Sequence, residues 1–310
     1  MPGVLGHIGL GKEASWGIGV APSVFYPATE EINQELARMR IEEPHASVMP
    51  LPSEAGRFSI QGGLRGIPAY TDAIGHLLLA FFGQVNTSGT AAPYTHVFDV
   101  LNGNLGADHA RPPYSVQVTK ESKTRRFVGG QLNQLKLAQD ADNYLKIDAD
   151  FIFKDFQDGL APATPSVPTD PVFGFRDLAV KRGGTAFPVR VESVEITFSN
   201  NLEAVNATGS DRIAAVDQGV VNAQAQFTVE FDDAAIYSDF VNDVASDYEF
   251  VWTRGGKSLA IKFYRGIIVS HSDPLSAAGR LTAVFTVDAE YDPASGKMAD
   301  ATLINDTASY

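Results

Sequence analysis

The sequence predicts a mainly β protein made of two similar β-sandwich domains in tandem, each with one flanking α-helix. Three observations predict this architecture. Strict alternation of apolar and polar residues recurs along the chain, two short segments have helical spacing, and a proline-rich stretch lies near the middle of the 310 residues. A chain of this length can bury a large core, and two domains of ordinary size are expected.

The alternation of apolar and polar residues predicts strands with one buried face and one solvent-exposed face. YLKIDADFIF places Ile147, Ala149 and Phe151 on one face and Asp148 and Asp150 on the other. The same pattern recurs in RFSIQGGL, VESVEITFS, QFTVEFD and RLTAVFTVDAEY. Each domain is expected to hold four long strands, which in the first half lie near 34–43, 57–64, 131–138 and 144–154.

Two segments instead have apolar residues three and four apart. DAIGHLLLAFF follows Thr71, a plausible N-cap, and AAIYSDFVNDV follows Asp233. Each segment comes after a strand and is predicted to be a helix.

The prolines of GLAPATPSVPTDPV disfavour both helix and central strand, and they predict a stiff connector. This places a linker at 159–172 between a first domain at 28–158 and a second at 173–310. The order of elements in the two halves is alike, which indicates a tandem duplication. Residues 1–27 have no apolar period and are predicted to form an extended N-terminal arm.

Composition narrows the classes of function. Lys plus Arg is 24 against Asp plus Glu at 37, a net charge of −13, which argues against tight binding to DNA or to an anionic membrane. The absence of cysteine excludes disulfides, thiolate metal sites and cysteine nucleophiles. The first residues lack a basic n-region, so the chain is expected to stay in a cytosol.

Motifs of catalysis and metal binding are incomplete. RGGKSLA resembles the end of a phosphate loop, but Val251 stands where the first glycine belongs and a strand follows. QDADNYLKIDAD gathers carboxylates, but a calcium loop needs glycine and glutamate where Leu145 and Phe151 stand. The six histidines are scattered. We therefore predict no catalytic residue, no cofactor and no metal.

The surplus of strands is the feature that needs explanation. Long amphipathic strands in two small domains leave sheet edges that are prone to pair with other chains, and closure into a ring is one solution.

Several segments resemble the tail tube proteins of long-tailed, siphovirus-like bacteriophages: GKEASWGIGVAP followed by FYP, LNQLKL with LKIDADF, and VESVEITFSNNLEAV. The resemblance implies a structural virion protein, not an enzyme. Its rings would stack into the tail tube, and the strands would contribute to an intersubunit β-barrel. A two-domain chain of this type implies trimeric, pseudo-hexameric rings, and a hexamer stays open. Implied partners are the tape-measure, tail-tip and terminator proteins, with no membrane. The implied location is the virion tail, and before assembly the protein would be in the host cytoplasm.

Geometry is consistent with a DNA channel. About 24 strands spaced about 4.8 Å apart and tilted about 40–45° give a barrel roughly 50 Å across, which leaves room for a duplex. An acidic lining would let viral double-stranded DNA pass without binding, because it repels phosphates. The predicted lining residues are Asp148, Asp150, Glu195, Glu230, Asp288 and Glu290, with Thr228 and Thr282 among them.

Contacts between rings are expected from the arm and the long loops. The arm is expected to stay loose in the monomer and to order on a neighbouring ring, with aromatic anchors. The predicted inter-ring contact residues are Trp16, Phe25, Tyr26, Asn200 and Asn201. Two alternatives stay open: a ring-forming tail-end or baseplate component, and a β-sandwich carbohydrate-binding or hydrolase module.

Overall fold

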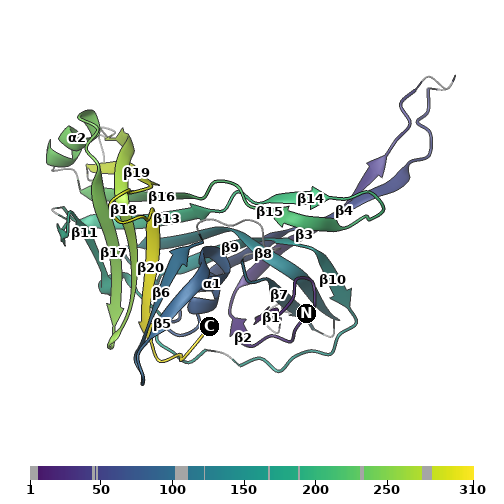
Figure 1. The fold of residues 1–310 in the computed structure, drawn as a ribbon, viewed down its shortest axis with the longest axis horizontal. Helices are drawn as coiled ribbons and strands as arrows, with labels where there is room; N and C mark the ends of the chain where they lie inside the picture. Colours follow the sequence, from purple (N-terminus) through teal and green to yellow (C-terminus); the bar gives the residue numbers. More distant parts are fainter. Residues whose placement is uncertain are drawn as a thin grey trace.

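The computed structural model describes residues 6–43, 46, 48–101, 111–121, 123–166, 168–187, 189–230, 234–273 and 281–310. The described chain is mainly β with two short α-helices, which confirms the predicted class (Figure 1). The first half holds β1 (His7–Lys12), β2 (Val24–Tyr26), β3 (Thr29–Met39), β4 (Glu54–Pro68), α1 (Gly75–Phe82), β5 (Gly83–Ser88), β6 (Tyr94–Val100), β7 (Tyr114–Lys120), β8 (Lys123–Asp140), β9 (Lys146–Phe153) and β10 (Asp155–Asp158).

After residues 159–171, whose described part contains no strand or helix, the second half begins with a short 3-10 turn, η2 (Phe175–Asp177). It continues with β11 (Leu178–Arg182), β12 (Thr185–Ala186), β13 (Val191–Ser199), β14 (Glu203–Asn206), β15 (Ile213–Asp217), β16 (Asn222–Glu230), α2 (Ala234–Val241), β17 (Ser246–Arg254), β18 (Lys257–Ser272), β19 (Thr282–Glu290) and β20 (Ala299–Asn305).

Strand pairing follows one plan in both halves. The β1–β2 hairpin pairs with β7, as the β11–β12 hairpin pairs with β17. Strand β8 pairs with β7, β9 and β10, as β18 pairs with β17, β19 and β20. In the described part of the chain, the hairpins β5–β6 and β14–β15 have no counterpart in the other half. This correspondence supports a tandem duplication at the level of topology.

Irregularities of the backbone recur at matching places. Asn133 is skipped where β8 pairs with β9, and Val269 is skipped where β18 pairs with β19, so each strand has a bulge. Three residues before each bulge stands a glycine, Gly130 or Gly266. A Cβ on Gly130 would lie 2.6 Å from the Phe153 ring, and one on Gly266 would lie 2.6 Å from a Tyr248 ring atom. The bulges and glycines align β8 with β18 residue by residue.

The two halves share one continuous antiparallel sheet, which we call the long sheet. Its strand order is β3-β4-β9-β8-β13-β16-β19-β18. The pairing of β8 with β13 joins the halves, with registers that run from Ser193↔Asp140 to Ser199↔Gln134. One face of the long sheet is buried in the core, and the core side chains include Phe151, Phe198 and Phe227, each exposed by 1% or less. Burying each such ring contributes about 1.5–3 kcal/mol.

The N-terminal segment differs from the expected loose arm. Strand β1 pairs with β7 over its whole length and with β2 on its other edge, so it begins the first repeat as β11 begins the second. Leu10 is fully buried. The glycines of HIGLGK hide this strand from a search for alternation, because β1 is buried on both faces and is held by backbone hydrogen bonds.

Glu13 fastens this segment to its own domain. Its buried carboxylate accepts hydrogen bonds from the Gly17 N–H (2.8 Å), the Ser115 hydroxyl (2.6 Å) and the Gly129 N–H (2.9 Å). Glu13→Gln places an amide NH₂ among donors, so we expect the free energy of unfolding to fall by about 2–3 kcal/mol in urea denaturation. The control Glu35→Gln lies on an exposed position and should change it by less than about 0.5 kcal/mol. Equal losses in the two variants would contradict this role.

Candidate functional site

The long sheet has an open edge at each end. In the described part of the chain, β3 pairs only with β4. At the other end, β18 from Ile267 to Ser272 pairs only with β19, within the same described residues. The first half of β18 is covered on both sides, so only its last residues are open. These two edges are the surfaces on which another strand can add.

Hydrogen bonds show which groups of β3 point outward. Phe58 lies opposite Leu36, and the Phe58 N–H donates to Asp211 O (2.9 Å) rather than to β3. Leu36 and Phe58 are therefore a non-hydrogen-bonded pair, and the backbone N–H of Leu36 points away from β4. Because the direction repeats every second residue, Gln34 and Ile32 also point outward. The Ile32 N–H is accepted by the Glu30 carboxylate (3.0 Å), which agrees with this direction.

Apolar side chains lie exposed on both open edges. Leu36 on β3 is 41% exposed, and Val269 at the bulge of β18 is 47% exposed. The alternation of the sequence does not reveal them, since exposure here comes from a missing neighbour strand rather than from the face of the sheet.

The junction of β8 with β13 shows how such edges fit together. The Asn200 N–H donates to the backbone oxygen of the bulge residue Asn133 (2.8 Å), and the Leu202 N–H donates to the Asn133 side chain (2.8 Å). Strand β13 occupies in the second repeat the place of β3 in the first, and β8 corresponds to β18. The β8–β13 junction therefore pairs, within one chain, the same two kinds of strand edge that stay open on β18 and β3 at the ends of the long sheet.

The structure places all eight predicted lining residues on one face of the long sheet, opposite the core. In each strand they alternate with buried side chains, and cross-strand registers such as Glu230↔Thr282 and Thr228↔Val284 keep them on that face. Most are half-buried between their neighbours, and Glu290 is exposed. The face was predictable because the period of two fixes it in every strand.

Basic side chains lie among these acids. Arg65 contacts Asp150 (2.6 Å) and Glu31 (3.2 Å). Further ion pairs join Lys136 to Glu195 (2.8 Å), Arg265 to Glu290 (3.1 Å) and Arg190 to Glu230 (3.9 Å). The hydrogen bond to Asp150 raises the pKa of Arg65 above its ordinary value. The acids still outnumber the bases on this face, so its net charge is negative.

The predicted inter-ring residues lie mostly inside their own chain. The Trp16 indole N–H donates to Gly129 O (2.9 Å), and the Tyr26 hydroxyl donates to Ala73 O (2.7 Å). Phe25 is 8% exposed. Asn200 is fully buried, and its Nδ2 donates to Leu132 O (2.8 Å) and Phe81 O (3.3 Å).

Asn201 is the exposed member of the set. Its φ is +47°, and its Nδ2 donates to Val220 O (2.7 Å), which closes the base of the loop that carries β14 and β15.

Two hairpins project from the long sheet. The β3–β4 hairpin extends far from the body of the molecule (Figure 1), with Ile41 and Val48 at 59% and 102% exposure. The β14–β15 hairpin lies beside β4, where Arg212 contacts Asp155 (2.9 Å) and lies over the Phe58 ring (4.3 Å).

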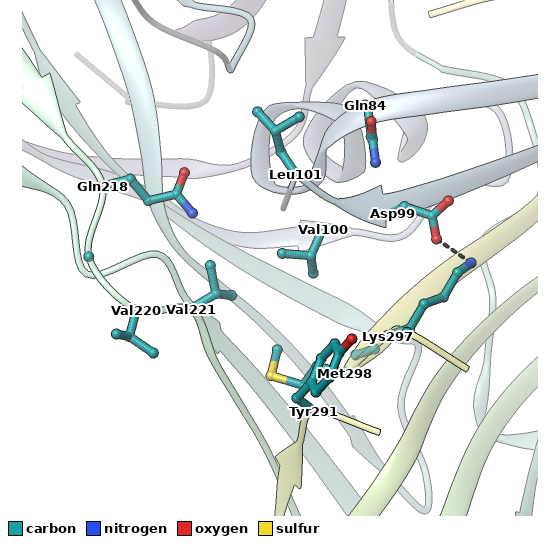
Figure 2. A pocket seen from close by; sticks show the side chains of 13 residues that line it. Gln84, Asp99, Val100, Leu101, Gln218, Val220, Val221, Tyr291, Lys297 and Met298 are labelled. Carbon is teal, nitrogen blue, oxygen red and sulfur yellow. Dashed lines mark ion pairs between the residues drawn. The ribbon is translucent and has the colours of Figure 1, made fainter. Parts of the chain in front are cut away.

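A cavity of about 770 Å³ lies between the β5–β6 insertion and loops of the second half (Figure 2). Asp99 is the one carboxylate among the residues that line it, and it is paired with Lys297. Contacts with Asp99 and Asp300 raise the pKa of Lys297. A hydrolase site of the carboxylate-pair type would need a second acid here.

Among the described residues no group of three or more His, Cys, Asp or Glu could hold a metal ion. No helix in the described chain is long and apolar enough to cross a membrane.

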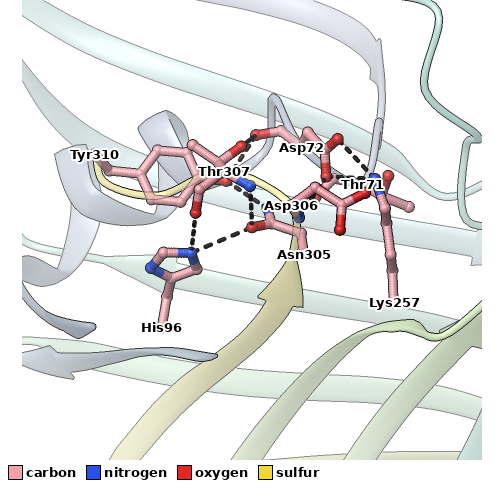
Figure 3. A network of polar contacts seen from close by, with 8 residues as sticks. All are labelled: Thr71, Asp72, His96, Lys257, Asn305, Asp306, Thr307 and Tyr310. Atoms are coloured by element: carbon pink, nitrogen blue, oxygen red, sulfur yellow. Dashed lines mark hydrogen bonds and ion pairs between the residues drawn. The ribbon is translucent and has the colours of Figure 1, made fainter. Parts of the chain in front are cut away.

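A polar network ties the C-terminal residues to the start of α1 (Figure 3). The Tyr310 hydroxyl donates to Asp72 O (2.6 Å), and Asn305 Nδ2 donates to Thr71 O (2.9 Å). Lys257 joins Asp72 (2.7 Å) to Asp306 (2.9 Å). Thr71 is therefore an anchor for the C-terminus, and the helix begins later than predicted, at Gly75.

His76 gives this region a pH dependence. Burial, with the charge of Lys12 as a smaller cause, lowers the pKa of His76 to about 4, and its ring packs edge-on against Tyr310 (5.2 Å). The fold favours the neutral ring, so this stability is complete above about pH 6.5 and falls as the pH drops towards 4. Between pH 7.5 and 4.5 we expect His76 to account for a loss of about 2.5 kcal/mol. His76→Gln should remove that part of the slope in urea denaturation, and an unchanged slope would contradict the assignment.

The arrangement is that of a self-associating structural protein: a long sheet with two open edges and a wet, acidic face. A family model described as Phage tail tube protein matches residues 3–293. The chain belongs to this phage tail tube protein family, and it is a structural component of the virion tail. A search of curated proteins finds no match.

Proposed function

We propose that three copies of the chain close their long sheets into one ring, and that the rings stack into the tail tube through which viral DNA leaves the virion. The observation that carries this proposal is the long sheet itself, with eight strands and an open edge at each end. Three such sheets give about 24 strands and a barrel roughly 50 Å across.

The wet face of the long sheet would line the channel. Its excess of acid repels DNA phosphates, and several of the bases that it contains are engaged in ion pairs, such as Arg65–Asp150 and Lys136–Glu195. Lys146 lies on this face as well, over the Tyr144 ring, so the lining would combine a majority of acids with a few bases. The two projecting hairpins and the loop held by Asn201 would reach the neighbouring ring. The tape-measure and tail-end proteins would complete the tail.

The internal repeat also predicts the register of the contact between copies. If β18 meets the next copy's β3 as β8 meets β13, Gln34 pairs with His271, and the Leu36 N–H donates to the oxygen of Val269 at the bulge. Asn33 then lies opposite Ser272 as a non-hydrogen-bonded pair on the channel face, with Cα atoms about 4.5 Å apart. That separation suits a disulfide.

A disulfide test uses the absence of native cysteine. The double variant Asn33→Cys/Ser272→Cys should form covalent trimers on oxidation of assembled protein, seen on a non-reducing gel. In the matched control Asn33→Cys/Ser270→Cys the second cysteine is shifted by two residues on the same face and should link weakly. Equal linking of both pairs would contradict the register, and linking of neither would contradict the ring. Single closed rings without stacks would favour a tail-end or baseplate role.

A further inference from the structure

Helix α2 lies at one end of the molecule (Figure 1), and it carries exposed apolar side chains. Tyr237 is 51% exposed, Val241 61% and Val244 42%. Tyr237 and Val241 belong to a helix of eight residues that packs on β18, next to the open edge of the long sheet, and Val244 follows shortly after its end. Exposed apolar residues gathered on one short helix indicate a surface that is covered in the assembled state.

The helix of the first repeat shows what covers such a surface. Helix α1 packs on β8 and reaches across the junction to β13 of the second repeat, where the rings of Phe81 and Phe82 each lie 5.4 Å from the ring of Phe198. All three rings are fully buried. The helix of the first repeat therefore covers the junction of β8 with β13 by packing on the first strand of the next repeat's part of the long sheet.

In the second repeat, the corresponding place is the open edge of β18 beside α2, where no strand is paired in the described part of the single chain. Tyr237 lies 5.2 Å from the ring of His271, and Phe240 lies 6.1 Å from it. His271 stands on the open part of β18, at the place that Leu135 holds on β8 opposite Phe198. The strand that would add there brings Gln34 opposite His271, so the helix would meet the core-facing side of β3.

That side of β3 borders an open groove of about 820 Å³. Ile32, Phe127 and Leu160 supply apolar walls. Among the charged residues that line the groove, Lys120 pairs with Glu30 and Arg125 pairs with Asp158, which leaves the positive charge of Lys123 in excess. The exposed carboxylate of Asp243, just after α2, is opposite in sign to Lys123. The groove and the helix thus match in polarity, and each lies beside an open edge of the long sheet.

We propose that α2 of each copy docks into this groove of the next copy in the ring, with Tyr237 and Val241 packed against Ile32. The proposal rests on the ring proposed above and names a second contact beside the strand pairing. It explains why the helix is apolar on its outer side, and why the groove is open in a single chain.

Cross-linking distinguishes this contact from the strand pairing. Assembled Tyr237→Cys/Lys123→Cys protein, treated with a short bifunctional maleimide, should give covalent dimers and trimers. Tyr291→Cys/Lys123→Cys is the matched control, since Tyr291 is 57% exposed but lies at the far end of β19 from α2, and it should give none. If Asn33→Cys/Ser272→Cys links while Tyr237→Cys/Lys123→Cys does not, the docking is wrong and the ring stands. If neither links, the ring itself is wrong.

Removal of the apolar surface gives an independent readout. Tyr237→Ser/Val241→Ser should raise the protein concentration needed for tube formation at least tenfold, with the melting temperature of the unassembled chain unchanged. The control Tyr291→Ser/Phe175→Ser removes two exposed apolar side chains elsewhere and should leave that concentration unchanged. An unchanged concentration in the α2 variant would overturn the proposal.

Discussion

Gln34→Pro is expected to abolish tube formation and to leave a folded single chain. The Gln34 N–H points away from β4, so its loss breaks no hydrogen bond of the long sheet within the chain. A proline is tolerated on an edge strand where its missing N–H faces solvent. Between copies it would remove the donor to His271 O and place a ring in the way of the added strand. Electron microscopy of concentrated protein should show dispersed particles where the parent chain forms tubes.

The matched control is Gln61→Pro. Gln61 lies on β4, an interior strand that pairs with both β3 and β9, so a proline there should reduce the stability of the fold itself. Urea denaturation of the unassembled proteins separates the two effects. Tubes of normal yield from Gln34→Pro would show that β3 is not the edge used in the ring.

Shortening the β3–β4 hairpin is expected to give rings that do not stack. Replacing residues 41–52 with Asn-Gly joins the two strands through a two-residue turn and removes the exposed Ile41 and Val48. The pairing of β3 with β4 below the tip stays intact, so the ring edge is kept. Size-exclusion chromatography should show a discrete trimer, and electron microscopy should show single rings.

The control for this deletion is the Asn33→Cys/Ser272→Cys pair in the shortened chain, which should link as in the full chain. Long tubes from the shortened chain would mean that the hairpin is dispensable for stacking. Loss of the disulfide would mean instead that the deletion disturbs the ring edge.

Much of the fold could be predicted because alternation depends on local sequence. The face that carries Asp148, Asp150 and Glu195 follows from the period of two, and the structure keeps that face in every strand of the long sheet. The order of elements also indicated the duplication. These features need no knowledge of which strand pairs with which.

Features that depend on pairing could not be predicted in the same way. Strand β1 lacks alternation because both of its faces are covered, so the sequence predicts a loose arm where the structure has a paired strand. Asn200 is a predicted inter-ring residue, yet in the single chain it is buried and donates a hydrogen bond to the backbone oxygen of Leu132. The exposed Leu36 and Val269 become visible as edge residues only once β3 and β18 are known to end the long sheet.

The central claim is that the polar faces of these sheets close between copies around an acidic channel. A cryo-EM density map of assembled tubes at side-chain resolution tests it most directly. We predict three copies per ring, β18 of each paired with β3 of the next, and the side chains of Asp150, Glu195 and Glu230 facing the bore. A map in which those carboxylates face outward, or in which β3 and β18 remain unpaired between copies, would contradict the account.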